Sequence, residues 1–267
     1  MNSRQTACAP PTHRPLALVT GSAKRLGRRV IEAFADAGYD CLIHAHRSGD
    51  EAQALRAHLA DRGVHAEVLL HHISDPASAA EALIEGAQGL FGRLPDTSVL
   101  CAASYDYDEA LSPVPHMLTQ QLALNFLFPV QYCAALGKAA STANVADRSV
   151  TLFTDYKVHR VNRDFFSYSI SKHALAGTLP YLAVAFAQQL RVNAIAPGPV
   201  LAAHGMTQDH LNQLVQASSV TARHPTADDI ARTAVFLAST PAMVGQHICV
   251  DAGARFDQVT RELVVPN

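Results

Sequence analysis

The chain has 267 residues, of which 49% are hydrophobic and 16% are charged, so it can bury the core of one large α/β domain. Its formal net charge of -2, without a basic stripe, argues against a nucleic-acid-binding protein. No stretch approaches the roughly 18 uninterrupted apolar residues of a membrane span. The five cysteines, an odd number without a C-x-x-C pair, indicate reduced thiols in a cytoplasmic protein.

The N-terminal segment is not expected to join the fold. It lacks the apolar core of about 7–15 residues that a secretory signal peptide needs. Its two proline-containing clusters instead indicate a flexible tail over residues 1–14. We therefore expect residues 15–267 to form a single domain.

Short apolar runs typical of buried strands alternate along the chain with longer segments of helical periodicity. Strands are expected at 16–20, 41–46, 66–71, 97–103, 149–154, 191–198 and 247–253. Helices are expected at 25–38, 50–63, 75–92 and 119–137, and around Tyr168 and Lys172. This alternation predicts an α/β fold with a single Rossmann-type, doubly wound, seven-stranded parallel sheet and helices on both faces.

Such sheets bind ligands beyond the carboxyl ends of their strands, where the connections diverge. Several residues of unusual type follow the predicted strands at that edge. They are Gly21–Gly27, His46–Ser48, Ala103 with Ser104, Asp155, and Pro197 with Gly198. The pattern therefore predicts one ligand site at the carboxyl edge of the sheet.

The segment "VTGSAKRLGRR" joins the first strand to the first helix and contains Gly21, Arg25, Leu26 and Gly27. Gly21 permits a tight turn, and Gly27 allows the helix to approach the sheet closely. The free N–H groups of the helix N-terminus could then bind a pyrophosphate. Arg25 replaces the middle glycine of a G-x-G-x-x-G motif, so an ordinary strand-to-helix turn fits the segment as well.

The end of the second predicted strand indicates which dinucleotide would bind. An acidic residue there is typical of NAD binding, because it holds the ribose hydroxyls. This chain instead has His46, Arg47 and Ser48, with Arg25 expected nearby. A guanidinium suits a phosphate dianion, so the segment favours NADP, although a solvated turn would read the same way.

Tyr168 and Lys172 are four residues apart and share one face of the predicted helix. A tyrosine hydroxyl has a pKa near 10, and a neighbouring ammonium would lower it toward the range needed for proton transfer at neutral pH. The spacing alone is common by chance. Its place after the fifth strand of a dinucleotide-binding fold makes it a more specific indication of catalysis.

Over roughly residues 14–255 the chain resembles the short-chain dehydrogenase/reductases. The resemblance rests on "TGSAKRLG", on Asn125 in "LALNFLF", on Tyr168 with Lys172, and on "RVNAIAPG" and "GQHICVDAG". It implies that Tyr168 is the proton donor, that Lys172 supports it, and that Asn125 orders a water relay. The implied NADP(H) contacts are Gly21, Arg25, Leu26, Gly27, His46, Arg47, Ser48, His72, Ile73, Ala103, Ser104, Tyr168, Lys172, Pro197 and Gly198.

The chain has Asp155 where most members of this family have a serine, thirteen residues before the tyrosine. This acid, Arg25 and the "HRS" segment resemble the pteridine reductase branch, in particular its dihydromonapterin reductases. The resemblance implies NADPH-dependent reduction of a dihydropterin or dihydrofolate, with hydride added at C6 and a proton supplied to N5 by Tyr168 and Asp155. A role for Asp155 as a loop cap remains the alternative.

The resemblance also implies a set of substrate contacts, a lid and an assembly. The substrate contacts are Arg25, Ser104, Tyr105, Asp155, Tyr168 and Leu201. Tyr105 or Tyr107 would stack on the pterin ring, although an ordinary packed tyrosine fits equally well. A substrate lid is expected at about 199–225. The relatives imply a homotetramer that binds a small pterin or folate, not nucleic acid or a membrane.

Two departures from the family pattern keep other functions open. Ala102 stands where an asparagine is usual, and His72 stands where an aspartate usually receives the adenine amino group. One alternative is a ketoreductase of 3-oxoacyl-type carbonyls, which Asp155 disfavours. The other is a non-catalytic NADP-binding sensor, which the intact Tyr168 and Lys172 disfavour. The adjacent His71 and His72 have a poor spacing for one metal ion, so no metal site is expected.

Overall fold

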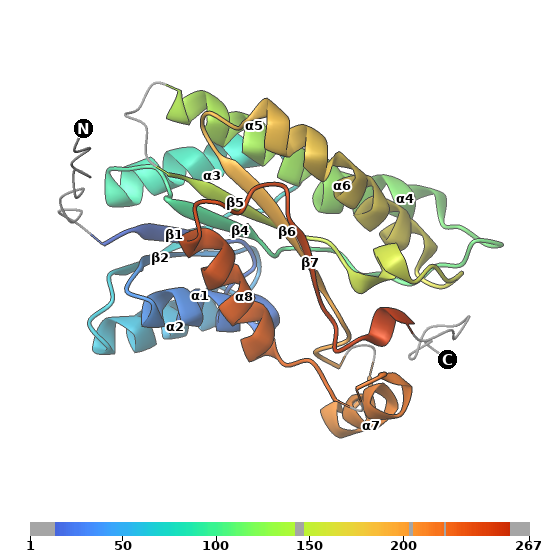
Figure 1. The fold of residues 1–267 in the computed structure, drawn as a ribbon. Coiled ribbons are helices and arrows are strands. Elements are labelled where there is room, and N and C mark those ends of the chain that lie inside the picture. The colour runs from blue at the N-terminus through green and yellow to red at the C-terminus, as the bar shows by residue number, and fades with distance from the viewer. Residues whose placement is uncertain (1–13, 142–146, 203–204, 222, 257–267) are drawn as a thin grey trace, which may run out of the picture.

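The computed structural model describes residues 14–141, 147–202, 205–221 and 223–256, so all but the last residue of the predicted N-terminal tail lies outside it. A seven-stranded sheet lies between two layers of helices (Figure 1). Its strands are β1 Leu16–Val19, β2 Asp40–Ala45, β3 Ala66–Leu70, β4 Thr97–Leu100, β5 Ser149–Phe153, β6 Arg191–Pro197 and β7 His247–Val250. Their order is β3-β2-β1-β4-β5-β6-β7, and all neighbours are parallel. The predicted fold class is confirmed.

Each face of the sheet is covered by its own helices. Along the chain these are α1 Arg25–Asp36, α2 Gly49–Asp61, α3 Pro76–Phe91, α4 Pro115–Leu122, α5 Phe128–Ala140, α6 Phe166–Ala185, α7 Gln208–Ser218 and α8 Ala227–Ser239. Helices α1, α2 and α8 pack on one face, and α3, α5 and α6 on the other (Figure 1). The strands are therefore apolar on both faces, which explains their nearly continuous hydrophobic runs.

Local signals set the ends of helix α3 as the sequence predicts. The Asp75 carboxylate accepts a hydrogen bond from the Ser78 N–H at 2.8 Å, and Pro76 occupies the first helical position. Gly92 ends the helix in the left-handed conformation with φ of 69°. These are the residue types that satisfy the free N–H and C=O groups at helix ends.

The helix predicted over 119–137 differs in form from the expectation. It begins earlier, in α4, and continues through a π-helical turn, Ala123–Leu127, into α5. Pro129 has no N–H to donate to the carbonyl of Asn125. The N–H of the preceding residue, Phe128, donates to the carbonyl of Ala123, five residues back, which is the bond that defines a π-helical turn. Such wide turns occur frequently at functional sites, and this one contains Asn125.

Arg191, at the start of β6, joins the sheet to the end of α8. Its side chain is 7% exposed, forms an ion pair with Asp147 at 2.6 Å, and donates hydrogen bonds to the carbonyls of Leu237 at 3.0 Å and Ala238 at 2.8 Å. We expect Arg191→Met to lower the free energy of unfolding by about 2–4 kcal/mol, because buried carbonyls lose their donor. Urea denaturation measures this change.

A matched control for that substitution lies on the surface of α8. Arg232 is largely exposed and forms an ion pair with Asp229 in the same helix. Arg232→Met should therefore change the free energy of unfolding by less than about 1 kcal/mol. Equal losses in the two variants would contradict the bridging role of Arg191.

Candidate active site

A cavity of about 610 Å³ opens at the carboxyl edge of the sheet. It lies where the chain turns from β1 toward β2 on one side and toward β4 on the other, the usual ligand position in such sheets. The predicted residues that line it are Gly21, Arg25, Leu26, Gly27, His46, His72, Ile73, Ala103, Tyr105, Asp155, Tyr168, Lys172, Pro197, Gly198 and Leu201. The remaining predicted residues are chain neighbours of lining residues: Arg47 and Ser48 follow His46, Ser104 follows Ala103, and Asn125 follows Leu124.

Backbone geometry in the loop after β1 fits a dinucleotide phosphate. Gly21 has φ of 66°, which glycine adopts without strain. A Cβ on Gly27 would lie 2.4 Å from the oxygen of Gly21, so only glycine lets α1 start this close to the turn. Lys24 and Arg25 place two cations at the helix N-terminus, where an anion is already favoured.

His44, in β2, holds the loop that follows β1 in place, a role that its position in the sequence did not indicate. Its Nδ1 accepts the Gly21 N–H at 3.1 Å, so the ring proton lies on Nε2, which donates to the His71 carbonyl at 3.1 Å. Burial lowers the pKa of His44 to about 4, so the ring stays neutral at physiological pH. A lone histidine in a buried strand resembles a core residue, and only the fold shows its two partners.

Arg25 connects the phosphate loop to the predicted lid. It has φ of 54°, unusual for a residue with a side chain, and its Nη2 donates to the carbonyl of Ala202 at 2.8 Å. Gln208, the first residue of α7, accepts the Ala202 N–H and donates to the carbonyl of Val200, both at 3.0 Å. The lid segment therefore contains a helix, α7, which the sequence analysis did not predict.

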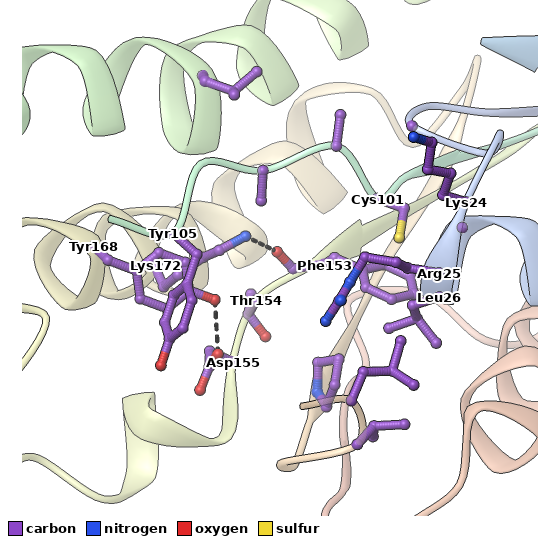
Figure 2. A pocket seen from close by; sticks show the side chains of 18 of the residues that line it. Lys24, Arg25, Leu26, Cys101, Tyr105, Phe153, Thr154, Asp155, Tyr168 and Lys172 are labelled. Carbon is purple, nitrogen blue, oxygen red and sulfur yellow. Dashed lines mark hydrogen bonds between the residues drawn. The ribbon is translucent and has the colours of Figure 1, made fainter. Parts of the chain in front are cut away.

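Three of the four predicted catalytic residues, Asp155, Tyr168 and Lys172, meet at one side of the cavity (Figure 2). The Tyr168 hydroxyl donates to Asp155 Oδ2 at 2.7 Å. The other carboxylate oxygen of Asp155 accepts the Lys157 N–H at 2.9 Å. Lys172 Nζ donates to the carbonyl of Phe153 at 2.6 Å and lies 5.6 Å from the centre of the Tyr168 ring. Asp155 thus caps a turn, as the alternative predicted, and also contacts the tyrosine.

The electrostatics of this group suit proton transfer. Burial lowers the pKa of Lys172 to about 8, and the Asp155 carboxylate opposes that shift. The side chain therefore remains largely an ammonium at neutral pH. A nearby ammonium stabilises the tyrosinate that forms when Tyr168 gives up its proton. The Asp155 carboxylate, which accepts the hydrogen bond of the Tyr168 hydroxyl, can also accept that proton.

A second buried lysine and an aromatic cluster enclose the same side. Lys157 is 2% exposed, and its Nζ lies 4.4 Å from the ring centre of Phe165. Tyr105 stacks on Phe165 with ring centres 4.2 Å apart, and Phe165 adopts φ of 53°. One face of Tyr105 is therefore covered by Phe165. Its stacking on a substrate remains a prediction.

Asn125 and Ser104 shape the loop that follows β4. The Asn125 side chain accepts the Ser104 N–H at 3.0 Å and donates to the Ser104 carbonyl at 2.9 Å. The Ser104 hydroxyl donates to Asp106. Ala102, which stands where the family usually has an asparagine, is fixed through its backbone, because its N–H donates to Thr20 Oγ1 at 3.0 Å. The water relay and the ligand contacts of Ser104 remain predictions.

Metal-ligating clusters and membrane-spanning helices were sought in the described ranges. Within them, no group of three or more histidine, cysteine, aspartate or glutamate residues is placed to hold a metal ion. In the same part of the chain, no helix combines the length and the hydropathy that crossing a membrane requires.

The family model for enoyl-(acyl carrier protein) reductase matches residues 21–255. The chain belongs to the short-chain dehydrogenase/reductase family. An uncharacterized oxidoreductase of Mycobacterium tuberculosis is 30% identical, over 94% of this chain and 95% of that protein. Pteridine reductase 1 of Leishmania tarentolae is 26% identical, over 90% of this chain and 96% of that protein.

A similar solved structure is FolM alternative dihydrofolate reductase 1 from Brucella suis in complex with NADP. It superposes with a TM-score of 0.82 at 28% identity, and the match covers 91% of this chain and 95% of that one. The predicted resemblance to the pteridine reductase branch and the predicted cofactor are thereby confirmed. The protein is an NADP-dependent oxidoreductase of this family.

Proposed function

We propose that this oxidoreductase uses NADPH to reduce a dihydropterin or dihydrofolate to the tetrahydro form. The observation that carries the proposal is the Asp155 carboxylate, hydrogen bonded at 2.7 Å to the Tyr168 hydroxyl in a cavity that also holds cationic Lys24 and Arg25. The similarity to pteridine reductase 1 and to the Brucella dihydrofolate reductase supports it.

A carboxylate at position 155 suits a ring nitrogen better than a ketone. Carbonyl reduction builds negative charge on oxygen, which a neighbouring carboxylate would repel. A pterin presents N–H and amino groups, for which a carboxylate is an acceptor. The negative charge of Asp155 therefore favours a pterin over a ketone as the substrate.

Some residues of the site would bind the cofactor, and others would transfer a proton to the substrate. NADPH, when bound, would supply the hydride that C6 of the pterin gains. The loop at Gly21 and the Arg47 guanidinium would hold the cofactor phosphates. Tyr168 donates the proton that N5 gains, while the Lys172 ammonium stabilises the resulting tyrosinate. A proton from water then restores the Tyr168 hydroxyl, and Asp155, in contact with that hydroxyl, relays it.

Further sequence-based assignments stay part of this proposal. Arg25 and Tyr105 would contact the pterin ring, and Leu201 would cover it from the lid segment. The homotetramer implied by the relatives and the cytoplasmic location inferred from the cysteine pattern also remain predictions.

A panel of substrates tests the proposed function. Oxidation of NADPH should occur with a 7,8-dihydropterin and with dihydrofolate, and should be at least about 100-fold slower with an acetoacetyl thioester. Turnover on the thioester alone would replace the proposal with a ketoreductase. Tight NADPH binding without turnover on any of the three would favour a sensor.

A further inference from the structure

Two histidines face each other at the end of the cavity formed by β2 and β3. Ala45 and Leu70 are the last register partners of these strands, and His46 and His72 follow them. The two imidazole rings are stacked, with centres 3.8 Å apart and planes inclined by 8°. Both side chains are exposed, and both line the cavity. The pair is thus accessible to a ligand that extends toward this end.

The surroundings of the pair carry an excess of positive charge. Lys24, Arg25, His44 and His71 line the same cavity, and Arg47 acts electrostatically on His46. Lys24 forms an ion pair with Glu51 at 2.5 Å. His44 is neutral, since both of its ring nitrogens are engaged within the loop. His72 stands where the family pattern has an aspartate, so a negative charge is absent at that position, and the neighbouring cations Lys24, Arg25 and Arg47 favour a dianion.

The proton content of the pair depends on what lies beside it. Two imidazolium rings with centres 3.8 Å apart would repel each other. Partial desolvation lowers the pKa of His46, and His72 and Arg47 lower it further. A phosphate dianion placed against the pair acts in the opposite direction and favours a bound proton.

We propose that the His46–His72 pair binds the 2′-phosphate of NADPH and takes up a proton with it, so that preference for NADPH over NADH rises as pH falls from about 8 to about 6. The sign follows from linkage: a ligand that favours the protonated pair binds more tightly at low pH, and this advantage is lost as pH rises. The inference rests on the cofactor assignment and is independent of the substrate.

Isothermal titration calorimetry tests this linkage directly. Titrations of NADPH and NADH at one neutral pH, in buffers with different ionisation enthalpies, give the number of protons taken up. NADPH binding should take up a large fraction of one proton, and NADH binding close to none. In the double variant His46→Gln with His72→Gln, proton uptake should disappear and the Kd for NADPH should rise about tenfold or more, with little change for NADH.

The control is His58→Gln, which removes an exposed imidazole from α2 outside the cavity and should leave both measurements unchanged. Equal proton uptake with NADPH and NADH would overturn the proposal. So would retained uptake in the double variant, or an equal loss of affinity for both cofactors. Failure of the pterin substrates leaves these binding measurements intact, so the two proposals can fail separately.

Discussion

Tyr168→Phe is expected to lower kcat by about 100-fold to 10,000-fold while leaving the Kd for NADPH within about twofold. The substitution removes only the hydroxyl, which donates to Asp155 at 2.7 Å, and retains the ring that lies beside Lys172. The proton that N5 must gain then has no donor at this position. Steady-state turnover of a dihydropterin and calorimetric titration with NADPH measure the two effects.

The same helix provides a matched control for this substitution. Tyr181 lies on α6 with its side chain 76% exposed, so Tyr181→Phe removes a hydroxyl far from the cavity. Its kcat should equal that of the unaltered protein. Unchanged turnover in Tyr168→Phe would remove the assignment of Tyr168 as proton donor, and a parallel loss of NADPH affinity would point to a binding role instead.

Asp155→Asn is expected to reduce kcat on a dihydropterin by about 100-fold or more. An asparagine keeps an oxygen that can accept the Lys157 N–H, so the turn that follows β5 keeps its cap. The substitution removes the negative charge beside the Tyr168 hydroxyl. The free energy of unfolding should therefore change by no more than about 1 kcal/mol, while turnover falls.

Asp155→Ser extends the test to substrate class. A serine hydroxyl can donate to a developing alkoxide, so this variant should lose pterin reduction and gain measurable reduction of a ketone or thioester. Asp75→Asn, which alters the cap of α3 away from the cavity, is the control and should change neither activity. Retained pterin turnover in both Asp155 variants would show that the carboxylate does not determine the chemistry.

The sequence predicts those features that depend on local pattern. Alternating apolar runs and helical periodicity define the strands and helices, and the parallel sheet then brings Gly21, Asp155 and Tyr168 to one edge without knowledge of any contact. The i, i+4 spacing of Tyr168 and Lys172 places both on one face of α6. These positions follow from backbone geometry alone.

Contacts between distant segments could not be predicted in the same way. Arg25 bonds to a carbonyl 177 residues further along the chain, a pairing for which no local signal exists. His44 resembles a core residue because it lies in an apolar strand, and Lys157 resembles a solvated lysine until Phe165 is placed over it. In each case the partner comes from another element, and side-chain pairing across elements leaves no periodic trace in the sequence.

The π-helical turn at Ala123–Leu127 sets the rotational phase between the two halves of one long helix. Before the turn α4 faces α6, and after it α5 faces α3. An α-helix turns about 100° per residue, so deleting one residue from the turn would rotate α5 by about that angle relative to α4. Tyr132, whose hydroxyl lies 2.7 Å from Ser98 Oγ in the core, would leave that partner. A sequence that forms this active site must therefore keep the number of residues in this turn as well as their types.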